Sequence, residues 1–76
     1  MNVERLIVMA NDIANFFAAE PDRAIAIDGV ASHFKRFWAP RMREQIIAHV
    51  RAHGAAELSD LASAAVMRLA ELEAKA

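Results

Sequence analysis

The sequence contains no cysteine, and this absence excludes several kinds of chemistry. Disulfides, thiolate metal sites, iron–sulfur ligation and a cysteine nucleophile all require that residue. Small secreted domains usually depend on disulfides, so we expect a reducing, cytoplasmic setting. Glu4 and Asp12 interrupt the apolar start of the chain, which does not fit a signal peptide, and no apolar run is long enough to span a membrane.

Glycine and proline are also scarce, with two of each in 76 residues, which leaves little room for linkers. At this length we expect a single helical domain over residues 1–76. A chain of this size buries only about 60% of the surface that its unfolded form exposes, so little material is left for an enclosed catalytic pocket. Because 18 of the hydrophobic residues are alanine, the core is thin, and we expect a partner to complete its burial.

Charge is distributed unevenly along the chain, although the net charge is only -1. Residues 1–32 carry -3, residues 33–53 carry +4 and residues 54–76 carry -2. We call residues 33–53 the basic island. The nearly neutral total argues against non-specific binding to nucleic acid.

Apolar residues recur at spacings of three and four, and no segment alternates with a period of two. This pattern predicts an all-α fold, a small bundle of four short helices with tight turns. We expect the helices over residues 3–17, 22–37, 40–53 and 60–73. The expected core face of the second helix consists of Ile27, Val30, Ala31, Phe34, Phe37 and Trp38.

Short polar residues, glycine and proline mark the predicted helix ends. Asn2 and Ser59 are expected N-caps, because their side-chain oxygens can accept free backbone N–H groups. Pro21 and Asp22 are expected to mark the start of the second helix, since proline is tolerated there. Gly54 should end the third helix. Gly29, inside the second helix, predicts either the close approach of a neighbouring helix or a local bend.

Histidine is the one residue type whose spacing suggests a metal site. His49 and His53 lie four apart on a predicted helix, and therefore share one face. Arg51 between them would repel a cation, and the H-E-x-x-H motif is absent, so surface histidines are the favoured interpretation. No nucleophile elbow, glycine-rich phosphate loop or acid–base pair is present. We therefore predict no catalytic, cofactor-binding or metal-binding residue in this chain.

Aromatic and basic residues cluster between the second and third predicted helices. The cluster consists of Phe37, Trp38, Arg41, Met42 and Arg43. Tryptophan and arginine are enriched where proteins bind one another, and methionine suits adaptable contacts. Two interpretations remain open: the cluster binds a partner, or its apolar members seal the corner between two helices.

The same two helices also permit a helix-turn-helix interpretation. DNA recognition needs polar base-reading side chains at the start of the second helix. Gln45 is the one candidate there. A nucleic-acid binder of this kind is therefore kept as an alternative, and no nucleic acid is the expected partner.

Three segments, VERLIVMANDIANFF, EPDRAIAIDGVASHFKRFWAPRMREQIIAHV and LSDLASAAV, together resemble the delta subunit of the soluble NAD-dependent molybdenum formate dehydrogenases. The most specific part is the string Phe37-Trp38-Ala39-Pro40-Arg41-Met42-Arg43, and Met9-Ala10-Asn11 and Phe16-Phe17 are secondary marks. The family commonly has Asp or Glu where this chain has Ala39. Losing that side-chain cap should cost the third helix about 0.5–2 kcal/mol.

The resemblance implies a non-catalytic accessory subunit. Its partners would be a catalytic alpha subunit that carries bis-molybdopterin guanine dinucleotide, and subunits that carry iron–sulfur clusters and FMN. That complex oxidises formate to carbon dioxide and passes the electrons to NAD. The delta subunit holds none of these cofactors, and the resemblance implies a role in assembly, cofactor retention or stability.

The resemblance and the aromatic–basic cluster together predict a docking site for the alpha subunit. Its expected residues are Phe16, Phe17, Phe37, Trp38, Arg41, Met42 and Arg43. In the isolated chain, the same apolar surface is expected to bind a second copy. A small helical adaptor of another complex is the remaining alternative.

Overall fold

A computed structural model describes residues 2–75 of the chain, which form four α-helices. The helices are α1 (Val3–Phe17), α2 (Arg23–Phe37), α3 (Pro40–His53) and α4 (Asp60–Ala74). No strand occurs among the described residues. The predicted all-α class is therefore confirmed. None of these helices has the length and apolar character that crossing a membrane requires.

Local capping explains where three helices begin. The Asn2 side chain accepts the Glu4 N–H at 2.7 Å, and the Ser59 hydroxyl accepts the Ala62 N–H at 3.2 Å, so both predicted caps are confirmed. The second helix begins at Arg23, one residue later than predicted. Its N-cap is Asp22, which accepts the Ile25 N–H at 3.1 Å. Pro21 therefore lies just before the N-cap, at the predicted break between the first two helices.

Helix α3 begins without a side-chain cap. Ala39 occupies the N-cap position with φ -62° and ψ 150°, and it has no side-chain oxygen to offer. Pro40 follows as the first helical residue, where a missing N–H is harmless. At the other end, Gly54 has φ 84°, a conformation that favours glycine, as predicted.

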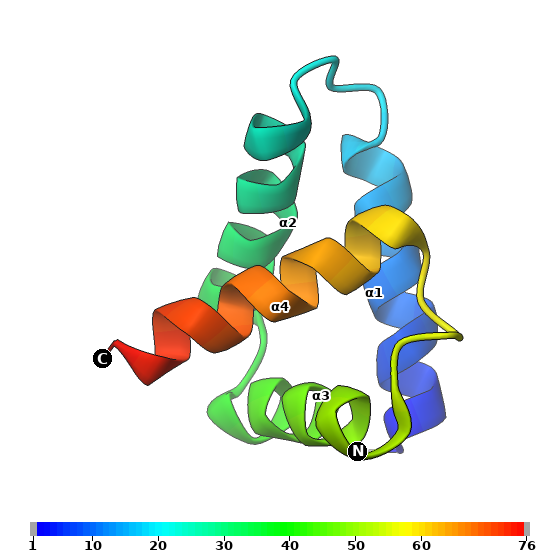
Figure 1. The fold of residues 1–76 in the computed structure, drawn as a ribbon, viewed down its shortest axis with the longest axis vertical. Coiled ribbons are helices and arrows are strands. Elements are labelled where there is room, and N and C mark those ends of the chain that lie inside the picture. The colour runs from blue at the N-terminus through cyan, green and yellow to red at the C-terminus, as the bar shows by residue number, and fades with distance from the viewer. Residues whose placement is uncertain (1, 76) are drawn as a thin grey trace.

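Helices α1 and α2 form a hairpin, and α4 crosses it (Figure 1). Figure 1 shows α1 and α2 side by side, with α4 running diagonally across them and α3 at their lower end. Helix α4 has its largest contact with α2. Helices α3 and α4 meet less extensively, and their separation leaves the recess described below.

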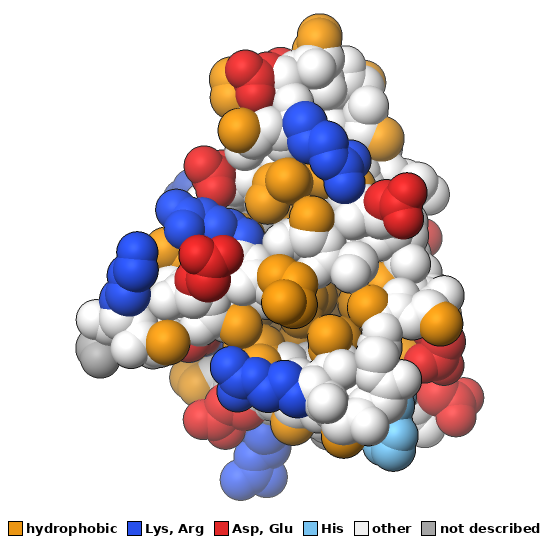
Figure 2. All heavy atoms as spheres, in the orientation of Figure 1, with side chains coloured by type: hydrophobic (Ala, Val, Ile, Leu, Met, Phe, Trp, Pro, Cys, Tyr) orange, Lys and Arg blue, Asp and Glu red, His pale blue; other side chains and the backbone are white. Residues whose placement is uncertain are grey.

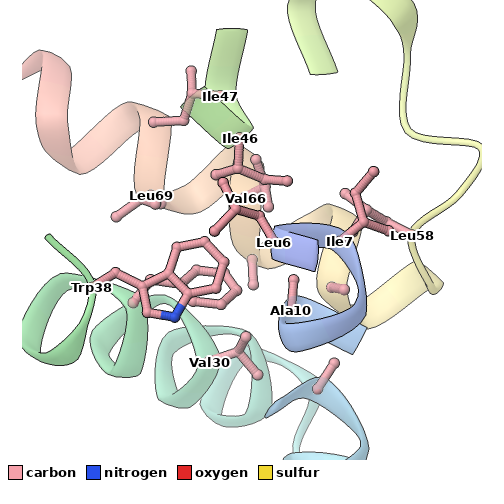
Figure 3. Packing of buried hydrophobic residues seen from close by; sticks show 14 residues of the cluster. Leu6, Ile7, Ala10, Val30, Trp38, Ile46, Ile47, Leu58, Val66 and Leu69 are labelled. Atoms are coloured by element: carbon pink, nitrogen blue, oxygen red, sulfur yellow. The ribbon is translucent and has the colours of Figure 1, made fainter. Parts of the chain in front are cut away.

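The core lies where all four helices meet. Its largest fully buried side chains are Phe34, Leu6, Ile46, Leu69, Val30 and Val66. Alanines at positions 10, 31, 62 and 65 are also buried, which allows close approach of the helix backbones. The Trp38 ring packs on Phe34 with centroids 4.5 Å apart, and Figure 3 shows it among the core residues.

At Gly29, the ring of Phe17 from α1 packs directly against α2. A Cβ atom at this position would lie 2.7 Å from Cε1 of Phe17, closer than atoms can pack. The predicted close approach of a neighbouring helix is confirmed. Phe17 in turn packs edge-on against Phe16, with ring centroids 5.3 Å apart.

Phe37 departs from the predicted core face of α2. It is 66% exposed, whereas Phe34 and Trp38 on either side of it are buried. Helical spacing does not explain the difference, because Phe37 follows Val30 by seven residues and Phe34 by three and therefore shares their face. Phe37 is the last residue of α2, and no described helix covers it there. The expectation that Phe37 belongs to the core was therefore wrong.

Candidate docking surfaces

The seven predicted docking residues do not share one environment. Phe16, Phe37 and Arg41 are exposed, Phe17, Met42 and Arg43 are half-buried, and Trp38 is only 4% exposed. The chain therefore buries some of these residues internally and leaves others at its surface.

Part of this set surrounds an open hollow between α1, α2 and α3, which we call the corner hollow. Its lining residues are Met9, Asp12, Ile13, His33, Phe37, Trp38 and Met42. Helix α1 contributes three of them at spacings of three and four, because Met9, Asp12 and Ile13 lie on one face. Phe37 ends α2, Trp38 lies in the turn that follows, and Met42 is in the first turn of α3, so all three come from the predicted corner between these helices.

Phe37 is the most prominent apolar side chain of the corner hollow. The His33 ring lies beside it, with centroids 4.7 Å apart. The Arg36 guanidinium lies 5.6 Å from the ring centroid, within the range of a cation–π contact. Phe37 is thus an exposed aromatic ring with an imidazole and a guanidinium beside it.

Trp38 forms the inner wall of the corner hollow. Burial of its ring shows that it seals the corner between α2 and α3, which is one of the two interpretations left open by the sequence. The indole nitrogen donates to no side-chain or backbone acceptor within residues 2–75, yet it is not fully enclosed. The indole N–H is therefore open to water.

Arg43 is committed to contacts inside the chain. Its guanidinium donates to Glu73 in α4 and to two backbone carbonyls, Trp38 O at 2.8 Å and Lys35 O at 3.2 Å. The side chain is only 15% exposed. Arg43 therefore joins the end of α2 to the end of α4 and is poorly placed to serve as a docking cation. The other cations of the basic island, Lys35, Arg36, Arg41 and Arg51, are exposed.

Asn11 also makes internal contacts, and the sequence did not predict them. Its amide donates to Glu57 O at 3.1 Å and accepts the Ser59 N–H at 2.8 Å. The side chain of α1 thereby holds the loop that leads into α4. This gives a structural reason for the Met9-Ala10-Asn11 mark noted above, and no local spacing predicts a partner 46 or 48 residues away.

The histidine pair lies at the end of α3, beside the same loop. The rings of His49 and His53 are 5.1 Å apart, and His49 Nε2 lies 3.0 Å from Glu57 Oε1. Among residues 2–75, no group of three or more metal-ligating side chains comes together. His49 thus finds a carboxylate partner within the protein.

A second recess lies between α3 and α4, which we call the α3/α4 groove. It has two adjoining parts of about 450 and 300 Å³ that share Ile47, Arg51, Ala70 and Ala74. The apolar part is lined further by Val50, Val66, Met67 and Glu71. Figure 2 shows hydrophobic side chains gathered in this recess, with a basic side chain on the α3 side. Sequence reasoning missed the groove, since its walls are far apart along the chain.

Comparison with known proteins gives one match. The model of the family described as NADH-dependent formate dehydrogenase delta subunit FdsD matches residues 5–66. No curated protein and no solved structure matches. All residues that line the corner hollow lie inside the matched segment, whereas most of the α4 wall of the α3/α4 groove lies beyond it.

Proposed function

This chain belongs to the NADH-dependent formate dehydrogenase delta subunit family, and from that premise we propose that it is a non-catalytic accessory subunit docked on the molybdopterin-containing catalytic subunit of the complex. Its role there is to support the assembly, cofactor retention or stability of that large subunit. The alternative of an adaptor for an unrelated complex is disfavoured by the family match.

The observation that carries the docking proposal is the corner hollow. It exposes Phe37 next to the half-buried side chain of Met42, and every residue that lines it lies within the family match. Exposed Arg36 and Arg41 lie close to these residues in the sequence. A surface with a phenylalanine, a methionine and flanking arginines has residue types that are enriched at protein interfaces.

The residues of this surface indicate which features a complementary surface on the catalytic subunit would have. Insertion of Phe37 into an apolar pocket of the catalytic subunit would remove its ring from water, and full burial of such a side chain is worth about 1.5–3 kcal/mol. Acidic residues at the edge of that pocket would pair with Arg36 and Arg41. The indole N–H of Trp38, which is open to water, would donate to a carbonyl of the partner.

In this proposal the redox chemistry belongs to the partner subunits. Bis-molybdopterin guanine dinucleotide would be held by the catalytic subunit, and iron–sulfur clusters and FMN by the others. This chain supplies a binding surface. Its binding would increase the free energy of unfolding of the catalytic subunit, because anything that binds the native state stabilises it.

Co-purification from cells that express the whole complex tests the proposal. We expect Phe37→Glu and Arg41→Glu each to reduce recovery of the catalytic subunit with the tagged chain by about tenfold or more, since interface anchors commonly contribute over about 1.4 kcal/mol. Arg43 should not be changed in this test, because the loss of its internal contacts would disturb the fold.

Ile25→Glu is the matched control, because Ile25 is 58% exposed on α2 and lines neither recess. It should leave co-purification at the wild-type level. Undiminished recovery with both Phe37→Glu and Arg41→Glu would show that the corner hollow is not the docking site. A wild-type chain that recovers no formate dehydrogenase subunit would contradict the accessory role itself.

A further inference from the structure

The α3/α4 groove has a floor suited to binding another protein surface. Ile47, Val50, Val66 and Ala70 line it, and Met67 stands at its edge with 57% of its surface exposed. Exposed methionine in an apolar recess is costly to leave in water and adapts readily to a partner. No residue of this groove belongs to the corner hollow, so the two surfaces can be occupied at the same time.

In the apolar part of the groove, the two walls carry opposite charges. Arg51 lies on the α3 wall and Glu71 on the α4 wall. Within residues 2–75, Arg51 forms no ion pair, and the contact of Glu71 with Arg68 is a long one at 3.9 Å between exposed side chains. The two walls therefore present one cation and one anion that the chain itself does not join to each other.

Such a pattern is complementary to itself under a two-fold rotation. In a dimer related by a two-fold axis, a contact between the α3 wall of one copy and the α4 wall of the other occurs twice. Arg51 of each copy then meets Glu71 of the other, and the two Met67 side chains cover the apolar floors. From this arrangement we infer that the occupant of the α3/α4 groove is a second copy of this chain.

The extent of the family match separates this surface from the proposed docking site. Met67, Ala70, Glu71 and Ala74 lie beyond residue 66, where the match ends. Self-association through the groove would therefore be added to the function that the family shares, and would join two copies while each corner hollow stays available. The sequence alone placed self-association on the docking residues instead.

Sedimentation equilibrium of the isolated chain tests the inference. A contact confined to one groove is small, so we expect a reversible dimer with a Kd on the order of micromolar. Met67→Glu should weaken the dimer about tenfold or more by placing a charge on the apolar floor, and Ile25→Glu should leave it unchanged. Circular dichroism of each variant, whose altered side chain is exposed, verifies that the helices persist.

Charge reversal tests directly whether Arg51 of one copy meets Glu71 of the other. Arg51→Glu and Glu71→Arg should each weaken self-association about tenfold or more, because like charges then oppose each other at both ends of the contact. An equimolar mixture of the two variants should restore the dimer to wild-type strength. In that mixture both walls of the first variant are acidic and both walls of the second are basic, so each contact again joins opposite charges.

Two outcomes would overturn the inference. One is a wild-type chain that stays monomeric at concentrations far above micromolar, and the other is a variant mixture that fails to re-form the dimer. Loss of the catalytic subunit on Met67→Glu, together with a monomeric wild type, would assign the groove to that partner instead. The proposed function fails separately, because its test depends on Phe37→Glu, which should leave the dimer intact.

Discussion

At the scale of single residues, Ala39 leaves the start of α3 without a side-chain cap. Its backbone has the extended conformation of an N-cap, but a methyl side chain cannot accept a backbone N–H. We expect Ala39→Ser and Ala39→Asp each to stabilise the chain by about 1 kcal/mol. For a domain of this size that gain raises Tm by about 4–8 °C, which thermal denaturation followed by circular dichroism would measure.

Comparison of the two substitutions identifies the cause of the gain. Serine supplies only the capping oxygen, whereas aspartate adds a negative charge that interacts favourably with the helix dipole. A rise in Tm with aspartate alone would mean that charge, not capping, limits the start of α3. If neither substitution raises Tm, the free N–H groups at the start of α3 gain nothing from a side-chain acceptor at position 39.

Arg43 and Asn11 show why part of the candidate site could not be predicted from the sequence. The members of the cluster around Trp38 are neighbours in the sequence, so a local pattern is enough to pick them out. What each member does depends on partners elsewhere: Glu73 is 30 residues from Arg43, and the loop that Asn11 holds is 46 to 48 residues away. Spacing rules reach only three or four residues along a helix, so they cannot separate a docking arginine from a structural one.

At the scale of helices, the sequence predicted the bounds to within one residue at every end that a cap or a glycine defines. Caps act within three residues of the helix they start, so their effect is visible locally. The misplaced start of α2 has the same origin, because Asp22 was taken as helical although its side chain is the cap. Exposure of Phe37 was not predictable, because it depends on where α1 and α3 end in space.

The contact between α1 and α2 gives a prediction at this scale. Gly29→Ala would place a methyl group 2.7 Å from the Phe17 ring. In the wild-type background we expect a loss of about 1–3 kcal/mol, the usual cost of overpacking. In a Phe17→Ala background the ring is gone, and the same change should instead stabilise the chain by up to about 1 kcal/mol through helix propensity.

The wild type, the two single variants and the double variant form a double-mutant cycle. Their free energies of unfolding, measured with heat or urea, give the coupling between Gly29 and Phe17. A change of sign between the two backgrounds would establish that the glycine exists to admit the ring. An equal stabilisation in both backgrounds would mean that the Phe17 ring moves aside freely, and that α1 and α2 are less tightly joined than their packing indicates.

At the scale of the whole molecule, the folded unit and the family match do not have the same extent. The match ends at residue 66, yet Leu69 is fully buried and Glu73 holds Arg43. Removing residues 67–76 would expose core that Leu69 covers, at about 2–5 kcal/mol, and would also leave Arg43 without its carboxylate. A protein of this length has about 4–11 kcal/mol of total stability.

We therefore expect the chain shortened after residue 66 to lose its cooperative thermal transition, whereas a chain shortened only after Ala74 should retain it. Circular dichroism during heating would show the difference. If the shorter chain unfolds alone but folds when it is co-expressed with the catalytic subunit, the corner hollow supplies enough binding energy to replace half of α4. If it stays folded alone, the four-helix core is complete without the C-terminal half of α4, and the α3/α4 groove can be removed without loss of the fold.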